Sequence, residues 1–197
     1  MPKTIDHEQR KADVAAAVWR LIVSSGVSAV SLRTVAAEAG IVLGSLRHSF
    51  PTKADLLAYS MQLVHANVEK RVATHTSIQD PHALVTGILL ELLPVDDQRY
   101  TEMRVNVALI AEAPAHPRLA ELAEAAQTAI ADLCLQLCRY LAETAHLHPT
   151  RDPGTEARRL HALIDGMALH ILVTPSAAAA TEAALSTYLK DLAAPSR

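Results

Sequence analysis

The sequence predicts an all-α fold of about nine helices, and three observations support this. Apolar side chains recur at three- and four-residue spacing through most of the 197 residues, as in amphipathic helices. Half of the residues are hydrophobic but only six are aromatic, so the core must consist of Ala, Leu, Val and Ile, which suits closely packed helices. Aspartate precedes proline at 80–81 and at 152–153, a pair that begins helices.

The N-terminal part is expected to form three helices and the start of a fourth. Ser31 is the expected N-cap of the second, because its hydroxyl can accept a backbone N–H of the first turn. Gly40 follows at the C′ position, where glycine adopts the left-handed conformation at least cost. Pro51 ends the third helix, and Thr52 begins the fourth with Asp55 three residues later, as in a capping box. The buried stripe of the first helix, within residues 10–26, is Val14, Ala17, Val18, Leu21 and Ile22.

The second and third helices, joined at Gly40, have helix-turn-helix geometry. Leu46 and Phe50 lie four residues apart and are expected to face the core. In this arrangement the second helix of the pair can enter the major groove of DNA. Its outward face would consist of Ser45, Arg47, His48 and Ser49.

The charge distribution agrees with DNA binding at one end of the chain. Residues 1–53 contain seven Lys and Arg against four Asp and Glu, a net charge of +3, and residues 54–197 contain eleven against seventeen, a net charge of −6. A basic head on an acidic body suits a protein that docks on DNA through the head. Lys53 stands at a helix start, where the helix dipole disfavours a cation, and a DNA phosphate bound there would explain it.

This segment resembles the DNA-binding domain of TetR-type transcriptional regulators over about fifty residues. The matching positions are Ser31, Arg33, Val35, Ala36, Ala39, Gly40, Gly44, Leu46, Phe50, Pro51, Lys53 and Leu56. Residues 160–170, L-H-A-L-I-D-G-M-A-L-H, are similar to the BetI-like branch. The resemblance implies a homodimeric repressor that binds palindromic operator DNA with reading heads about 34–36 Å apart. It also implies release by a small-molecule effector, and no cofactor.

Two positions depart from the family pattern. Arg47 replaces the usual Tyr of the recognition helix and could bind guanine O6 and N7 bidentately. Val42 replaces a Ser or Thr that would cap this helix, and with Leu43 it could instead contact thymine methyl groups. The predicted DNA contacts are Arg33, Thr34, Val42, Leu43, Gly44, Ser45, Arg47, His48, Ser49 and Lys53.

The remainder of the chain is predicted to be helical. The expected helices span residues 52–74, 81–93, 96–113, 117–146, 153–173 and 176–193. We expect residues 1–53 to form the DNA-binding domain and residues 54–197 an effector-binding and dimerisation domain. The last two helices are apolar on more than one face, which favours a dimer interface over burial within one subunit. The predicted interface residues are Leu163, Met167, His170, Ile171, Leu185, Tyr188 and Leu189.

The effector pocket implied by the resemblance would be lined by polar groups, and one Met, on mostly apolar stretches. Asn106 is the strongest candidate, because a buried amide must find partners. The alternative is that Asn106 bonds a neighbouring helix and that each histidine is an ordinary core or interface residue. The predicted lining is His65, Met103, Asn106, Gln127, His161 and His170.

Other chemistry finds little support in the sequence. Cys134 and Cys138 lie four apart among leucines and are expected to be reduced and buried, although with His146 or His148 they could form a metal site. Nucleophile-elbow, phosphate-loop, dinucleotide and zinc-protease motifs are absent, so we expect neither catalysis nor a catalytic metal. The polar N-terminus and the lack of a long apolar run predict a cytoplasmic protein without a membrane partner. Abundant Ala and the excess of Arg over Lys, thirteen to five, point to a bacterial source. The alternative function is a helical ligand-binding or protein-interaction dimer that has lost operator binding.

Overall fold

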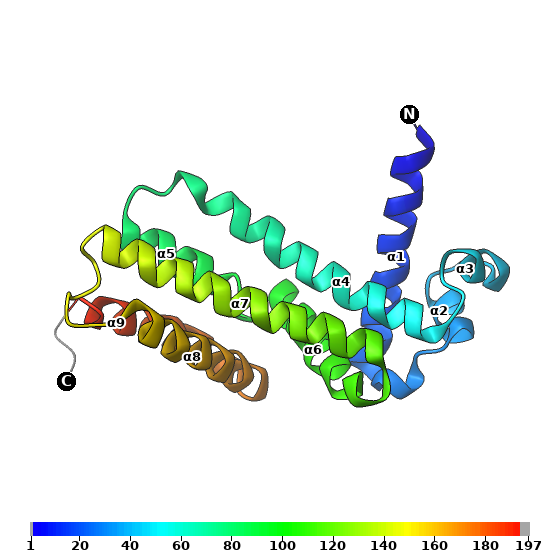
Figure 1. The fold of residues 1–197 in the computed structure, drawn as a ribbon. Coiled ribbons are helices and arrows are strands. Elements are labelled where there is room, and N and C mark those ends of the chain that lie inside the picture. Colours follow the sequence, from blue (N-terminus) through cyan, green and yellow to red (C-terminus); the bar gives the residue numbers. More distant parts are fainter. Residues whose placement is uncertain (1, 194–197) are drawn as a thin grey trace. The chain divides into compact units, whose positions relative to one another are not determined.

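The computed structural model describes the backbone of residues 2–193 and the side chains of that range except those of residues 2–6, 76 and 77. Within this part the chain forms nine α-helices, four short 3₁₀ helices and no strand (Figure 1), which confirms the all-α prediction. The helices are α1 (Pro2–Ser25), α2 (Leu32–Glu38), α3 (Leu43–Ser49), α4 (Lys53–Val72), α5 (Pro81–Leu90), α6 (Asp97–Glu112), α7 (Pro117–Glu143), α8 (Pro153–Val173) and α9 (Ala178–Asp191).

The chain divides into two compact units. The first combines Met1–Asn67 with Arg104–Glu124, and the second combines Val68–Met103 with Ala125–Arg197. Helices α4, α6 and α7 therefore contribute to both units. The units follow packing and do not coincide with the expected boundary at residue 53, which remains a prediction about function.

The predicted helix starts are confirmed where a side chain caps them. Ser31 Oγ accepts the Thr34 N–H at 3.1 Å, while Thr34 Oγ1 accepts the Ser31 N–H at 2.9 Å, which completes a capping box. Thr52 and Asp55 form a second such box at α4. Asp80 and Asp152 each accept a backbone N–H at 2.7 Å at the starts of α5 and α8.

Most helices lie within three residues of their predicted bounds, and α5 ends at Leu90 where the prediction was residue 93. The ends of α1 and α7 differ in instructive ways. Helix α1 begins at Pro2, eight residues before the expected start. The sequence of residues 2–9, P-K-T-I-D-H-E-Q, is mostly polar, so apolar periodicity did not predict this part of the helix. Helix α7 ends at Glu143 instead of His146. Ala145 there adopts a left-handed φ of 60°, and the His146 N–H donates to the Leu141 carbonyl at 2.7 Å, as in a Schellman-type end.

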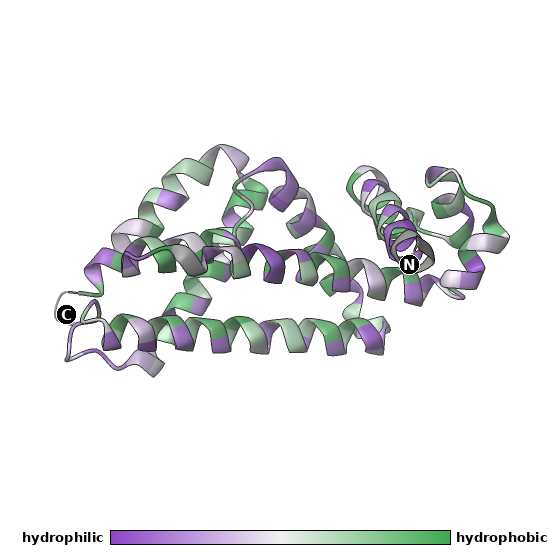
Figure 2. Cartoon of the chain, turned by 90° about the horizontal axis from the view of Figure 1, so that it is seen from above, coloured by the Kyte–Doolittle hydropathy of each residue, from purple (hydrophilic) through white to green (hydrophobic). Residues whose placement is uncertain are grey.

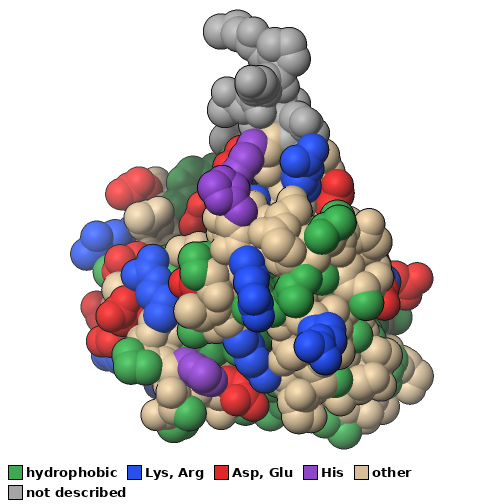
Figure 3. All heavy atoms as spheres, turned by 90° about the vertical axis from the view of Figure 1, so that its right-hand side faces the viewer, with side chains coloured by type: hydrophobic (Ala, Val, Ile, Leu, Met, Phe, Trp, Pro, Cys, Tyr) green, Lys and Arg blue, Asp and Glu red, His purple; other side chains and the backbone are tan. Residues whose placement is uncertain are grey.

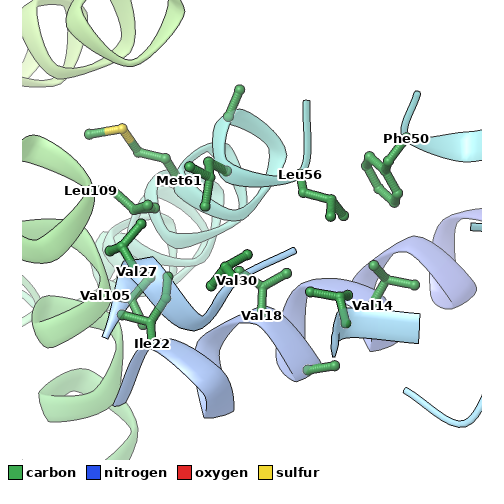
Figure 4. Packing of buried hydrophobic residues seen from close by; sticks show 14 of the residues in the cluster. Val14, Val18, Ile22, Val27, Val30, Phe50, Leu56, Met61, Val105 and Leu109 are labelled. Atoms are coloured by element: carbon green, nitrogen blue, oxygen red, sulfur yellow. The ribbon is translucent and has the colours of Figure 1, made fainter. Parts of the chain in front are cut away.

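The core of the first unit is built almost entirely from aliphatic side chains. Figure 4 shows Val14, Val18 and Ile22 of α1 pointing toward Leu56 and Met61 of α4. The predicted stripe of α1 is confirmed: its members are buried, apart from the half-buried Leu21, which packs against the same core. The cluster also includes Val35, Leu46, Phe50, Val105 and Leu109, so α2, α3 and α6 share it.

The second unit has its own core and a partly buried ionic network. Helices α5, α7, α8 and α9 contribute Leu and Ile side chains to this core, and Figure 2 shows apolar and polar residues alternating along the helices. Arg71 joins Glu91 and the buried Glu102, each at 2.9 Å, while His75 lies 3.0 Å from Glu91. These pairs connect the end of α4 to α5 and α6.

Candidate nucleic-acid interface

One side of helix α3 packs against the core of the first unit, and the other side is exposed to solvent. Leu46 and Phe50 are almost fully buried, as predicted. Gly44, Ser45, Arg47 and His48 are exposed, and Ser49 is half-buried. We call these five residues the outer face of α3. Seven residues are few for a stable isolated helix, so the buried side chains must hold α3 in place.

Two cations of this region have no partner among the described residues. Arg33, in the first turn of α2, and Arg47 are exposed, and no acceptor among the described residues binds either guanidinium. By contrast, Arg20 is paired with Glu38. Figure 3 shows Lys and Arg side chains in the middle of the surface that includes this region, with acidic side chains mostly toward its edges. Unpaired guanidinium groups suit phosphate or guanine binding, because both ligands accept bidentate hydrogen bonds.

The three consecutive apolar residues that connect α2 to α3 differ in burial. Ile41 and Leu43 pack against the first core, whereas Val42 is 77% exposed. Val42 is the N-cap of α3 and makes no side-chain capping bond, as its residue type predicts. A Ser, Thr, Asn or Asp at an N-cap typically stabilises a helix by about 0.5–2 kcal/mol relative to an uncapped one.

Two of the predicted DNA contacts are also engaged within the protein. Lys53 Nζ donates to the Val27 carbonyl at 3.1 Å, which joins the start of α4 to the 3₁₀ helix Val27–Ala29 that follows α1. The Thr34 hydroxyl donates to the Ala29 carbonyl at 2.8 Å and belongs to the cap of α2. An ammonium group has three donors, so Lys53 can bind a phosphate in addition, and its DNA role stays a prediction.

The six predicted pocket residues lie in several separate environments. In the first unit, His65 Nε2 lies 3.2 Å from Asn106 Oδ1, a hydrogen bond between α4 and α6. In the second unit, His161 Nε2 lies 2.9 Å from Gln127 Oε1, a bond between α7 and α8. Met103 packs against the second core, and His170 is exposed on α8. The alternative that Asn106 bonds a neighbouring helix therefore matches the geometry.

An open apolar groove runs between α8 and α9. Its volume is about 360 Å³. Leu163, Met167 and His170, three of the predicted interface residues, line it. The other members are mostly small side chains that the interface prediction omitted, although their three- and four-residue spacing could have revealed them. They are Ala162, Gly166, Ala177, Ala180, Thr181 and Ala184.

Three of the predicted interface residues do not fit that role. Ile171, Leu185 and Leu189 are at most 1% exposed in the single chain and belong to its own core. Tyr188 is half-buried, with its hydroxyl 3.5 Å from Glu156 Oε2. The predicted set combined residues of two faces, because both helices are apolar on two sides and periodicity does not say which side packs internally.

The two cysteines are buried thiols. Burial raises the pKa of Cys134 to about 11 and, with the neighbouring Cys134 and Glu156, that of Cys138 to about 12. Both therefore stay protonated at neutral pH, which disfavours thiolate chemistry. In the described part of the chain no three His, Cys, Asp or Glu side chains are grouped so that they could hold a metal ion. No described helix is both long enough and apolar enough to cross a membrane.

Comparison with known proteins decides the family. Residues 14–59 match the model of the bacterial regulatory proteins of the tetR family, and residues 81–194 match that of the BetI-type transcriptional repressor C-terminal domain. The chain belongs to the TetR family of transcriptional regulators. The TetR-type match covers α2 and α3, and the BetI-type match includes the groove between α8 and α9.

Related regulators cover most of the chain. The HTH-type transcriptional regulator PksA of Bacillus subtilis is 40% identical over 177 residues, 89% of this chain and 84% of PksA. The HTH-type transcriptional regulator BetI of Stenotrophomonas maltophilia is 28% identical over 170 residues, 85% of this chain and 83% of BetI. A transcriptional regulator of Rhodococcus sp. Rha1 has a similar structure, with a TM-score of 0.78, 27% identity and coverage of 92% and 95% of the two chains.

Proposed function

We propose that this TetR-family regulator is a homodimeric repressor that reads a palindromic operator through α3 and is released by a small-molecule effector in the bacterial cytoplasm. The exposed, unpaired Arg47 on the outer face of α3 is the observation that supports this most directly. An exposed guanidinium on a short helix that is anchored by Leu46 and Phe50 can form two hydrogen bonds to guanine. Arg33, also unpaired, can bind the phosphate backbone beside it.

The groove between α8 and α9 supports the dimer. On α8, Leu169 and Val173 are 56% and 78% exposed and share a helical stripe with Gly166. Exposed apolar residues next to small ones allow a second helix pair to pack closely. A second copy of this chain fits this surface, because a two-fold axis presents the same groove from both subunits, as a palindromic operator requires.

The effector is the least constrained part of the proposal. The His65–Asn106 and His161–Gln127 hydrogen bonds are the polar contacts that a ligand could replace. With only six aromatic residues in the chain, an aliphatic or amphipathic effector is favoured over a flat stacked one. A structurally similar regulator from Saccharomonospora viridis was solved in complex with choline, at 22% identity and a TM-score of 0.78. Ligand binding would shift the dimer between two states of different operator affinity.

Binding to the DNA beside the gene tests the proposal. Purified protein should bind one palindromic fragment tightly, and the affinity should fall as salt increases, because phosphate contacts release counterions. Arg47→Ala should lose about 1–3 kcal/mol at one base pair per half-site and relax the preference there. Equal loss on all operator variants would assign Arg47 to phosphate. Binding no tighter than to random DNA would instead support a dimer that has lost operator recognition.

The dimer is tested separately by a charge on the exposed apolar stripe of α8 that contains Leu169. Leu169→Glu should leave the fold intact but move the protein toward monomer in sedimentation, and thereby weaken operator binding. Gln136→Glu, at an exposed site on α7, is the matched control and should remain dimeric. A fully dimeric Leu169→Glu protein would place the interface elsewhere.

A further inference from the structure

Val42 presents an apolar side chain where the fold does not need one. Its neighbours Ile41 and Leu43 pack against the first core, while Val42 is 77% exposed. As the N-cap of α3 it makes no side-chain capping bond. The backbone contributes here in the ordinary way, since the Ser45 and Leu46 N–H groups donate to the Val42 carbonyl at 3.0 and 3.2 Å. Nothing in these contacts requires a valine.

The position of Val42 suits contact with a base edge. It directly precedes α3 and lies one turn before the exposed Ser45. Residues near the start of a recognition helix are those that reach base edges in the major groove. The two γ-methyl groups of valine cannot hydrogen-bond, so they can recognise only an apolar group there. In the major groove of unmodified DNA that group is the C5-methyl of thymine.

We propose that Val42 reads the C5-methyl group of one thymine in each operator half-site. The inference rests on the proposed operator binding and adds a specificity residue that is separate from Arg47. The structure narrows the earlier expectation of an apolar Val42–Leu43 pair to Val42 alone, because Leu43 is committed to the core. The contact also accounts for a residue that leaves α3 uncapped.

Replacement of thymine by deoxyuridine removes the methyl group and keeps base pairing unchanged. With the operator fragment from the binding experiment, each thymine is replaced singly by deoxyuridine, and dissociation constants are measured by fluorescence anisotropy at fixed salt. One thymine per half-site should stand out, with about fourfold weaker binding per methyl lost, or about fifteenfold when both half-sites are changed. A duplex with 5-methylcytosine at that position separates the two sources of a C5-methyl. Valine can contact either methyl group, so the proposal requires that 5-methylcytosine bind no more tightly than thymine.

Two variants show whether Val42 is the reader. Val42→Ala should bind the thymine and deoxyuridine duplexes equally. Val42→Thr should raise the melting temperature by restoring a capping hydroxyl while reducing the discrimination, so the loss cannot come from unfolding. Val107→Ala, a matched change at an exposed valine on α6, should keep the full thymine preference.

The outcomes separate this proposal from the proposed function. If the wild type and Val42→Ala discriminate thymine from deoxyuridine equally, or if the wild type discriminates at no position, Val42 is not the reader while operator binding stands. Tighter binding to 5-methylcytosine than to thymine overturns the thymine assignment. If the wild type binds no fragment better than random DNA, the proposed function and this inference both fall.

Discussion

Lys53→Met separates a structural role of Lys53 from a role in DNA binding. The ammonium group donates to the Val27 carbonyl at 3.1 Å and has two donors left for a phosphate. The contact is only partly buried, so water can replace part of it, and its loss should cost about 1 kcal/mol. In a chain of this length that lowers the melting temperature by about 2–4 °C.

The same variant should also change operator binding, and this effect is recognised by the salt dependence of the affinity. A dimer carries two copies of Lys53, so loss of two phosphate contacts should flatten the plot of log affinity against log salt by about 1.8. When salt is raised from about 50 to about 200 mM, the factor by which affinity falls should therefore be about 12 times smaller for the variant than for the wild type. Lys190→Met, at an exposed site on α9, is the control and should keep the wild-type slope. A lowered melting temperature with an unchanged slope would refute the phosphate contact and leave Lys53 as a purely structural residue.

Three further predictions concern the second unit. A Cβ added at Gly87 would lie 2.7 Å from His75 Nδ1 and displace the ring from Glu91, so Gly87→Ala should lower the urea midpoint. In a His75→Ala background the clash is absent, so Gly87→Ala should raise the free energy of unfolding by about 1 kcal/mol, because alanine favours the helix more than glycine. Equal effects in both backgrounds would contradict the clash. Burial, and then a neighbouring imidazole, lowers the pKa of His82, so the melting temperature should decline as pH falls below about 6.5, and His82→Gln should weaken that decline. An identical pH profile for the variant would exclude His82. Leu185→Ala should lower the free energy of unfolding by about 2–5 kcal/mol at every protein concentration, because Leu185 is a core residue. A loss that depends on protein concentration would instead assign Leu185 to the dimer interface.

The sequence predicted those features that depend on neighbouring residues. Ser31, Asp80 and Asp152 begin helices because each side chain binds a backbone N–H three residues away. Gly40 has the left-handed φ of 65° expected after α2. Such interactions are local, and their geometry follows from residue type alone.

The sequence could not predict features that depend on which helices meet. His65 and Asn106 are 41 residues apart, and only the packing of α4 on α6 makes them partners. On α8 and α9, both apolar faces have the same period, so Leu185 and Met167 were equally good interface candidates. Burial within the chain separates them, since Leu185 is in the core and Met167 lines the groove.

The attachment of α3 explains how this head can change its specificity while it keeps its fold. A seven-residue helix without a side-chain cap depends on tertiary contacts, which here come from Leu43, Leu46 and Phe50. Arg47 forms none of these contacts. The Val42 carbonyl accepts hydrogen bonds from the first turn of α3, but its side chain is exposed and makes no capping bond. Substitutions at these two positions can therefore alter base recognition with little effect on the position of α3. Affinity changes in Arg47 and Val42 variants should accordingly report recognition, while variants of Leu46 should lose folding and binding together.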